Sequence, residues 1–386
     1  RSFILANNDS NLNLRTGFTT GSCASAAAKA AVTSLITGSP VNTVQILLPV
    51  GKEQSFDVHR CEFVNDNEVL CSIIKDAGDD PDVTHGAEIC ATVSIYESDQ
   101  NSIDVILKKG DGVGLVTKPG TGIEVGGPAV TRVPRRMITS SVVDAVKANS
   151  PDFNGTVEVT LSVPGGEAIA EKTTNARLGV IGGISILGST GIVHPYSTAS
   201  WRASVHVAID VAATNKIDHV VLTTGTRSEE YSKRLLDLED MAFVQVGIFS
   251  GHSMKRASMR GIKRVSHVGM IGKFAKLAKG YFVTHVAGNQ VDVQFLSELA
   301  EQVGAPADVL DKLLATTSGR EFQEIALDNK LDDIYPILCD LVCQKSSEFM
   351  GEESSNLIID AMCFDFEGNL LGSSSTSGSI PIVAKR

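Results

Sequence analysis

The sequence predicts two domains of different class, an α+β domain in the first half and an α/β domain with a mainly parallel sheet in the second. Two observations carry this prediction. Strand patterns outnumber helix patterns over residues 1–165, whereas short apolar strands alternate with helices of about ten residues from residue 216 onward. The length of 386 residues also suits two or three domains, because single hydrophobic cores rarely grow beyond about 250–300 residues.

The first half opens on a small polar loop, RTGFTTGSC, and then an alanine-rich run that favours a helix starting near Gly21 or Ser22. A second helix is expected over residues 137–149. Alternating or apolar runs predict strands at 41–50, 68–74, 88–96, 102–107 and 156–163. These elements together define the α+β domain of residues 1–165.

Residues 166–215 contain a glycine-rich stretch, which is either a binding loop or the connection between domains, and a helix over 198–214. Residues 216–372 then form the second domain. Its first strands are expected at 219–222, 243–247 and 264–269. Each leads into a helix, and this alternation predicts a Rossmann-like parallel sheet with crossover connections.

The rest of this domain is predicted to be two or three longer helices over 291–350 and a strand over 356–365. The low-complexity residues GSSSTSGS predict a flexible tail over 373–386.

The composition limits the partners of the chain. There are 34 Lys and Arg against 45 Asp and Glu, so the net charge is −11, and aromatic residues make up only 5%. Nucleic-acid binders need basic surface and stacking platforms, and membrane surfaces attract basic segments, so neither partner is expected. The seven cysteines include no CxxC pair, which favours free thiols in a reducing, cytoplasmic compartment.

Small and polar residues follow each strand of the second half. Ligands bind at the carboxyl ends of strands in open α/β sheets, and free N–H groups at helix starts hold carboxylates or phosphates. A nucleotide-like ligand therefore suits this edge, although Gly and Thr also make turns and N-caps without a ligand. The candidate cofactor-binding residues are Thr224, Gly225, Thr226, Ser228, Glu229, Gly247, Gly269 and Gly272.

Two basic groups stand out in an acidic chain. Residues 255–279 hold eight Lys and Arg and no Asp or Glu, and Arg132, Arg135 and Arg136 form a second group. Concentrated positive charge would attract a polyanionic small ligand and hold its carboxylates. A solvated helix face is the alternative explanation for any run of charges.

The acidic stretch over residues 75–88 contains Asp80 and His85, which are candidates for a general base or a substrate hydrogen-bond acceptor. Its spacing matches no calcium loop and it has one His, so no protein-bound metal is expected. A surface loop rich in Asp is the alternative. The stretch TTGSCASAAA could instead cradle phosphates, which keeps an ATP-dependent phosphotransferase open.

Five stretches together resemble one family. They are LRTGFTTGSCASAAAKAA from Leu14, KDAGDDPDVTHGAE from Lys75, GDGVGLVTKPGTGIEVGGPAVTRVPRRMI from Gly110, NARLGVIGGISILGSTGIVHPYS from Asn175 and HVGMIGKFAKLAKGYFVTH from His267. Their content and order resemble the cobalt-precorrin-5B C1-methyltransferases, the CbiD type, of the anaerobic cobalamin (vitamin B12) pathway. The resemblance runs from residue 14 to at least residue 285.

The resemblance implies that a methyl group passes from S-adenosylmethionine to C1 of cobalt-precorrin-5B, which gives cobalt-precorrin-6A. The macrocycle carbon is then the nucleophile, in agreement with the lack of any nucleophile motif in the sequence. The cobalt arrives within the substrate. An NADPH-dependent precorrin reductase is a further alternative. A homo-oligomer is compatible with these expectations.

The resemblance also suggests where the ligands bind. S-adenosylmethionine is expected at the strand-end residues of the second half. The polycarboxylate tetrapyrrole is expected between the domains, with His85 or Asp80 as the catalytic base. The expected substrate-binding residues are Thr19, Thr20, Arg135, Arg136 and His285.

Overall fold

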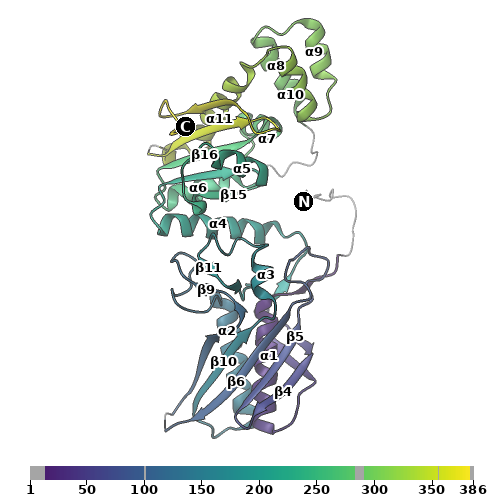
Figure 1. Ribbon diagram of the computed structural model, residues 1–386, viewed down its shortest axis with the longest axis vertical. Coiled ribbons are helices and arrows are strands. Elements are labelled where there is room, and N and C mark those ends of the chain that lie inside the picture. The colour runs from purple at the N-terminus through teal and green to yellow at the C-terminus, as the bar shows by residue number, and fades with distance from the viewer. Residues whose placement is uncertain (1–13, 100, 283–290, 355, 383–386) are drawn as a thin grey trace. The chain divides into compact units, whose positions relative to one another are not determined.

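The computed structural model describes residues 14–99, 101–282, 291–354 and 356–382. Its internal contacts divide the chain into two compact units, Arg1–Ser197 and Thr198–Arg386 (Figure 1). Both units mix helices with sheets that contain parallel and antiparallel neighbours. No helix in the described part of the chain is long and apolar enough to cross a membrane.

The first unit is built on a five-stranded sheet with the order β4-β5-β6-β10-β7. All its neighbours are antiparallel except β10 and β7, which run parallel. The strands are β4 (Arg60–Asn65), β5 (Glu68–Ile74), β6 (Glu88–Glu97), β7 (Ile103–Lys109) and β10 (Gly155–Ser162). The sequence located four of these five, and it missed β4, four of whose six residues are exposed.

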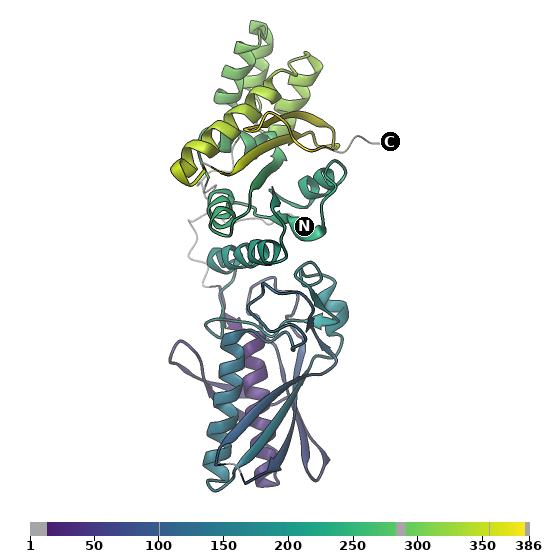
Figure 2. The same cartoon turned by 90° about the vertical axis from the view of Figure 1, so that its left-hand side faces the viewer.

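Two long helices, α1 (Thr20–Thr37) and α2 (Arg132–Asn149), lie side by side along one face of this sheet (Figure 2). The buried alanines of α1 allow the close approach, and the helix ends at Gly38, whose left-handed φ of 65° suits glycine. The inward residues of the strands, such as Val93 and Val159, complete the core beneath the two helices.

The glycine-rich residues 166–197 belong to the first unit, and the division between Ser197 and Thr198 falls within the stretch over 166–215 that was expected to connect the domains. Short strands tie this stretch to earlier parts of the unit. β11 (Val180–Ile181) pairs with β9 (Leu115–Val116), β12 (Gly183–Ile184) with β8 (Gly112–Val113), and β13 (Ile192–Val193) with β1 (Gly17–Phe18). A Cβ at Gly183 would lie 2.2 Å from the Gly112 carbonyl oxygen, so backbone packing requires a glycine there.

Three smaller elements complete the first unit. They are β2 (Thr43–Leu47), its antiparallel partner β3 (Glu53–Asp57) and the short helix α3 (Gly166–Ala170).

The second unit is built on a five-stranded sheet with the order β15-β14-β16-β17-β18. The first four strands are parallel, and β18 runs antiparallel to β17. The strands are β14 (His219–Thr223), β15 (Phe243–Gln245), β16 (Arg264–Met270), β17 (Ile358–Phe364) and β18 (Leu370–Ser375). The sequence located all of them except β18.

Helices cover both faces of this sheet. The face of Val220 and Leu222 packs against helices that include α6 and α7, and the opposite face, of Val221 and Val268, packs against α5. The helices next to the sheet are α4 (Thr198–Thr214), α5 (Thr226–Lys233), α6 (Ser250–Met259), α7 (Ile271–Ala278) and α11 (Ile334–Met350). Three more follow α7: α8 (Val293–Gln302), α9 (Ala307–Leu314) and α10 (Gly319–Asp328).

Two sequence predictions for this unit were wrong. The stretch over 291–350 contains four helices instead of two or three. The residues expected to begin a flexible tail at 373 belong to β18, where Ser373 lies opposite Met362 and Ser374 opposite Ala361. A Ser-rich sequence has little strand preference of its own, but pairing with the buried strand β17 satisfies its backbone groups.

Candidate functional site

The acidic loop that joins β5 to β6 is held at its base by a buried ion pair. The ammonium of Lys75, only 1% exposed, donates to Asp82 Oδ2 at 2.7 Å. Burial alone would raise the pKa of Asp82, but the Lys75 charge and hydrogen bonds from Thr84 hold it below its usual range. Breaking such a pair leaves a buried charge without a partner, which typically costs 3–5 kcal/mol. Lys75 therefore fixes the loop in place. The burial of its side chain indicates this role, whereas the sequence pattern around it does not.

A second pair holds the outer part of the loop. The Arg15 guanidinium bonds to both carboxylate oxygens of Asp76, and the Arg15 amide donates to Asp79 Oδ2 at 2.6 Å. The hydrogen bonds from Arg15 and the Gly78 amide lower the pKa of Asp76 to about 2. Asp76 is therefore an anion at any working pH, and it is a poor candidate for a general base.

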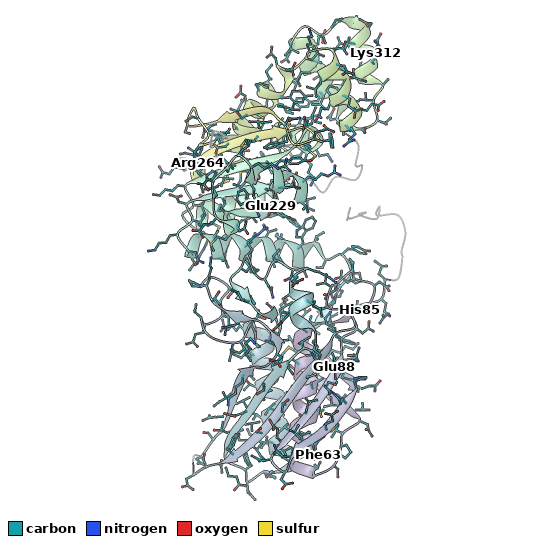
Figure 3. The ribbon with its side chains drawn as sticks, in the orientation of Figure 1. Phe63, His85, Glu88, Glu229, Arg264 and Lys312 are labelled. Atoms are coloured by element: carbon teal, nitrogen blue, oxygen red, sulfur yellow. The ribbon has the colours of Figure 1, made fainter. Side chains whose placement is uncertain are left out.

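His85 projects from this loop, near the start of β6 at Glu88 (Figure 3). Its side chain is 54% exposed, and its Nδ1 accepts a hydrogen bond from the Ala77 amide at 3.1 Å. A neutral imidazole that accepts through Nδ1 carries its proton on Nε2. In this arrangement His85 presents an N–H donor to solvent. Such a donor is suited to binding a substrate carboxylate and is less suited to removing a proton from the substrate.

Asp80 lies on the same loop with one oxygen engaged. Its Oδ1 accepts from the Tyr196 amide at 2.8 Å, and Tyr196 has an unusual left-handed φ of 56°. Residues other than Gly, Asn and Asp seldom adopt this backbone conformation. The hydrogen bond from the Tyr196 amide to the Asp80 carboxylate helps to maintain it. The second oxygen, Oδ2, has no hydrogen bond among those of the described residues and can accept a proton.

Thr19 and Thr20 use their hydroxyls within the protein. Thr19 is the N-cap of α1 and accepts from the Ser22 amide at 3.2 Å. The Thr20 hydroxyl accepts from the Leu187 amide at 2.9 Å and lies within reach of the Ser185 and Leu187 carbonyls. Both side chains are buried. They join the helix to the glycine-rich stretch, and their contact with a substrate stays a prediction.

Arg132, Arg135 and Arg136 are exposed at the first turns of α2. No ion pair or hydrogen bond is found for these guanidinium groups within the described residues, and no acidic residue lies in the first turn. Positive charge at the positive end of a helix dipole is unfavourable by roughly 0.3–1 kcal/mol per group. An anion bound here would remove that penalty.

A cleft of about 290 Å³ opens beside these arginines. It combines two of the three guanidinium groups with the glycine-rich turn before α2, and it is lined by Gly122, Ile123, Glu124, Val130, Arg132 and Arg135. The structure thus brings Arg135 to a concave surface, whereas Arg136 is absent from the lining.

The basic stretch over residues 255–279 does not form one positive patch. Arg256 on α6 and Arg260, which directly follows this helix, both bond to Asp210 of α4. Arg264 pairs with Asp360 of β17, and Lys279 pairs with Asp292. The acidic partners lie outside the stretch, so the interpretation of these eight residues as a polyanion site is wrong for at least these four.

The carboxyl ends of β14 and β16 meet where the strand order reverses, since the chain runs from β14 to β15 on one side and to β16 on the other. Ligands of open α/β sheets bind at such switch points. The turn after β14 begins with Thr224, whose amide donates to the Val268 carbonyl at 3.2 Å. Gly225 is extended, with a φ of 171°, and a Cβ there would meet no atom within 4 Å. The lack of a side chain at Gly225 therefore has no explanation in the protein itself.

The other residues predicted at this edge divide by role. Ser228 accepts from the Gly225 amide and donates to its carbonyl, and Thr226 is exposed at the start of α5. Glu229 is buried, with its carboxylate bonded to Gln245 at 2.8 Å and Lys233 at 3.0 Å (Figure 3). Ser228 and Glu229 thus hold the helix in place, and their contact with a ligand stays a prediction.

The glycines of this edge serve mainly in packing. A Cβ at Gly247, which has a left-handed φ of 56°, would lie 2.0 Å from the Trp201 ring. At Gly269 it would lie 3.0 Å from Phe274, and at Gly272 3.3 Å from Val291. His285, the remaining predicted substrate residue, lies outside the described residues.

Lys273 at the start of α7 is one of the eight basic residues over 255–279, but it is not among the candidate cofactor-binding residues predicted from the sequence. Its ammonium donates to the Thr224 carbonyl at 2.6 Å and so bridges from α7 to the turn after β14. Burial and the neighbouring Lys276 lower the pKa of Lys273. Its place in the GMIGK stretch directly after a strand was the available signal.

No group of three or more His, Cys, Asp or Glu side chains suited to a metal ion exists within the described ranges. All seven cysteines are free thiols, and six of them are buried. The expectation that the protein holds no metal of its own stays a prediction.

Comparisons with known proteins identify the family of the chain. A family model described as CbiD matches residues 7–195, and one described as CbiD, C-terminal domain, matches residues 283–375. A relative from Leptospira borgpetersenii serovar Hardjo-bovis is 44% identical and covers 93% of this chain and 95% of its own. A Priestia megaterium relative is 40% identical, covering 95% and 97%. Both are named cobalt-precorrin-5B C(1)-methyltransferase.

Among solved structures, a cobalamin biosynthesis protein (cbiD) from Archaeoglobus fulgidus is 24% identical, with a TM-score of 0.37. The alignment covers 84% of this chain and 87% of that one.

Fold and site together define a two-unit protein of mixed α and β structure, with an arginine-lined cleft in one unit and a mainly parallel sheet in the other. The chain belongs to the CbiD family, as the relatives at 44% identity over 93% of its length show.

Proposed function

We propose that the protein methylates C1 of cobalt-precorrin-5B to give cobalt-precorrin-6A, with S-adenosylmethionine as the methyl donor, in anaerobic cobalamin biosynthesis. The observation that carries the proposal is the match over nearly the whole chain to relatives with this name. These names favour methyl transfer over an ATP-dependent phosphotransferase or an NADPH-dependent reductase.

The donor site is proposed at the switch point between β14 and β16, which would make the second unit a Rossmann-like donor-binding domain. The residues there fit an amino-acid nucleoside. Gly225 leaves open space against its backbone, and Lys273 offers a cation for a carboxylate. The Glu229 carboxylate is bonded to Gln245 and Lys233, so we propose that Glu229 holds α5 in place beside the donor.

The tetrapyrrole site is proposed at the arginine-lined cleft of the first unit. The substrate carries many carboxylates, and guanidinium groups bind carboxylates through two parallel hydrogen bonds. Arg132 and Arg135 have no competing ion pair within the described residues, so binding an anion costs them no existing contact. The loop that carries Asp80 and His85 completes the proposed substrate surface.

Bound S-adenosylmethionine supplies a methyl group whose bond to sulfur breaks as the bond to C1 forms, with the electron pair left on sulfur. The protein's share of the reaction is to bind, orient and exclude water. Asp80 is the proposed acceptor, through Oδ2, for a proton that leaves the macrocycle. His85, with its proton on Nε2, is the proposed donor to a substrate carboxylate.

Calorimetric titration with four ligands tests the proposal. We expect S-adenosylmethionine and S-adenosylhomocysteine to bind the full chain, and ATP and NADPH to show no heat of binding. A ligand that binds only the folded state also raises the melting temperature, so a thermal shift provides a second readout. Binding of ATP or NADPH without S-adenosylhomocysteine would overturn the donor assignment.

A further inference from the structure

Lys273 occupies a special place in the second unit because α5 and α7 lie on opposite faces of the sheet. The side chain starts in the first turn of α7, and its ammonium reaches the Thr224 carbonyl, which precedes α5. It therefore spans the switch point where the two helices diverge. Gly269, between the two, leaves little room, since a Cβ there would lie 3.1 Å from the Thr224 methyl group.

The charge of Lys273 is not balanced by the protein. An ammonium has three donors, and the Thr224 carbonyl uses one of them. No carboxylate pairs with Lys273 in the part of the chain that the structure describes, and its neighbour Lys276 adds positive charge. A partly buried charge without a counter-ion is unfavourable, and a neutral donor could hold one carbonyl at lower cost. The arrangement is favourable when an anion binds beside the ammonium.

We propose that Lys273 binds the carboxylate of the amino-acid moiety of the methyl donor while it remains anchored on the Thr224 carbonyl. This rests on the proposed function, and it names a contact within the proposed donor site. The anchor sets the position of the ammonium beside Gly225, whose open backbone leaves space for the ligand. Lys273 thereby fixes the end of the donor that is remote from the methyl group, and this orients the sulfur.

Decarboxylated S-adenosylmethionine isolates this contact, because it keeps every other group of the donor. Calorimetry would compare it with S-adenosylmethionine on the full chain and on Lys273→Met. We expect the wild-type protein to bind S-adenosylmethionine at least about tenfold more tightly than the decarboxylated form, as loss of one charge-assisted hydrogen bond predicts. In Lys273→Met the two ligands should bind with equal affinity.

Two further variants serve as controls. Lys276→Met removes a charge one turn further along α7 and should keep the wild-type preference. Lys273→Arg keeps the positive charge and should retain most of the wild-type preference for S-adenosylmethionine. Since the wild-type comparison needs no variant, a failure of Lys273→Met to fold leaves the test intact.

The possible results separate the two proposals. Equal affinity of the wild-type protein for both ligands would overturn the role of Lys273 and leave the donor site standing. A preference that persists in Lys273→Met would do the same. If the wild-type protein binds neither ligand, both the donor site and the role of Lys273 are wrong.

Discussion

At the scale of single residues, two glycines at the same edge of the second unit have opposite reasons to be glycine. Gly247 needs its left-handed φ of 56° and lies against the Trp201 ring. Gly225 is extended, and the space beside its α-carbon is open. Packing explains the first, whereas we propose that the second leaves space for a ligand.

These two positions give a matched pair of substitutions. Gly247→Ala should lower the free energy of unfolding by roughly 2 kcal/mol or more, because both the backbone and the Trp201 contact are strained. Gly225→Ala should change it by less than about 0.5 kcal/mol. We expect Gly225→Ala instead to weaken S-adenosylhomocysteine binding by about tenfold, through a methyl group placed in the ligand's space. Chemical denaturation and calorimetry measure both quantities, and normal binding by Gly225→Ala would contradict the account.

Asp80 allows a separation of its two roles. Asp80→Asn keeps an oxygen for the Tyr196 amide but cannot take a proton, whereas Asp80→Ala loses both functions. We expect Asp80→Asn to fold with wild-type stability and to lower kcat by about a hundredfold, the lower range for loss of a general base. Asp80→Ala should in addition raise KM. Full-rate turnover by Asp80→Asn would show that no proton passes through this carboxylate.

The candidate site could be predicted from sequence only where the chemistry is local. The group around Arg135 stood out because its charges are adjacent in the chain, and no ion pair neutralises them among the described residues; its contact with a substrate stays a prediction. The stretch over 255–279 misled because the carboxylates that neutralise Arg256 and Arg264, those of Asp210 and Asp360, lie 46 and 96 residues away. Pairing over such distances is set by the sheet topology, which no local pattern contains.

At the scale of elements, the first turns of α2 combine a helix dipole with guanidinium charges of the same sign. This cost to stability is expected to be recovered when a carboxylate binds. We therefore propose that the cleft beside Arg132 and Arg135, which Glu124 also lines, binds an anion.

The double variant Arg132→Gln with Arg135→Gln should raise KM for the tetrapyrrole by at least about tenfold, because hydrogen bonds to charged groups contribute roughly 1.5–3 kcal/mol each. Its free energy of unfolding should stay the same or rise slightly. Lys147→Gln, at the other end of α2, is the control and should leave KM unchanged. An unchanged KM in the double variant would place the substrate elsewhere.

A chain of buried polar side chains connects three strands of the second unit. It lies toward the end of the sheet opposite the carboxyl ends of β14 and β16. His219 Nε2 donates to Ser266 Oγ at 2.7 Å, and Ser266 donates to Asp360 Oδ2 at 2.7 Å. Burial lowers the pKa of His219 from 6.5 to about 4 despite the nearby Asp360. The unfolded chain thus takes up a proton at this residue between pH 6.5 and 4, while the folded chain does not.

The free energy of unfolding should therefore be highest above pH 6.5 and fall as the pH drops toward 4, by up to ~3 kcal/mol from His219 alone. His219→Gln keeps a donor for Ser266 but does not titrate, so its stability should fall less over the same range. The buried His267, whose pKa is also lowered to about 4, remains in both proteins and contributes equally. Parallel stability curves for the two proteins would contradict this assignment.

Most of the sheet strands and the helices beside them were predictable because their apolar periods are clear. β18 was not, since its Ser-rich sequence carries no strand signal and its stability comes from pairing with β17. The exact point of division within residues 166–215 was not predictable for a related reason. The glycines of 166–197 pack backbone against backbone within the first unit, as Gly183 does on Gly112, and composition alone does not distinguish such packing from a linker.

At the scale of the whole molecule, each hydrophobic cluster of the described residues lies within one unit. The net charge of −11 also does not show where the positive charges lie or which of them are paired. Four of the eight basic residues over 255–279 form ion pairs within the protein, whereas the arginines at the start of α2 and Lys273 are the proposed ligand contacts. We therefore expect an acidic protein to bind a polycarboxylate substrate and the single carboxylate of the methyl donor.

The central claim is methyl transfer to C1, and an isotopically labelled donor tests it most directly. The full chain would be incubated with cobalt-precorrin-5B and S-adenosylmethionine labelled in its methyl group, and the product examined by nuclear magnetic resonance and mass spectrometry. We predict one labelled methyl group per macrocycle, bonded to C1, with S-adenosylhomocysteine released in equal amount. A product without label, or with label on another carbon, would contradict the account.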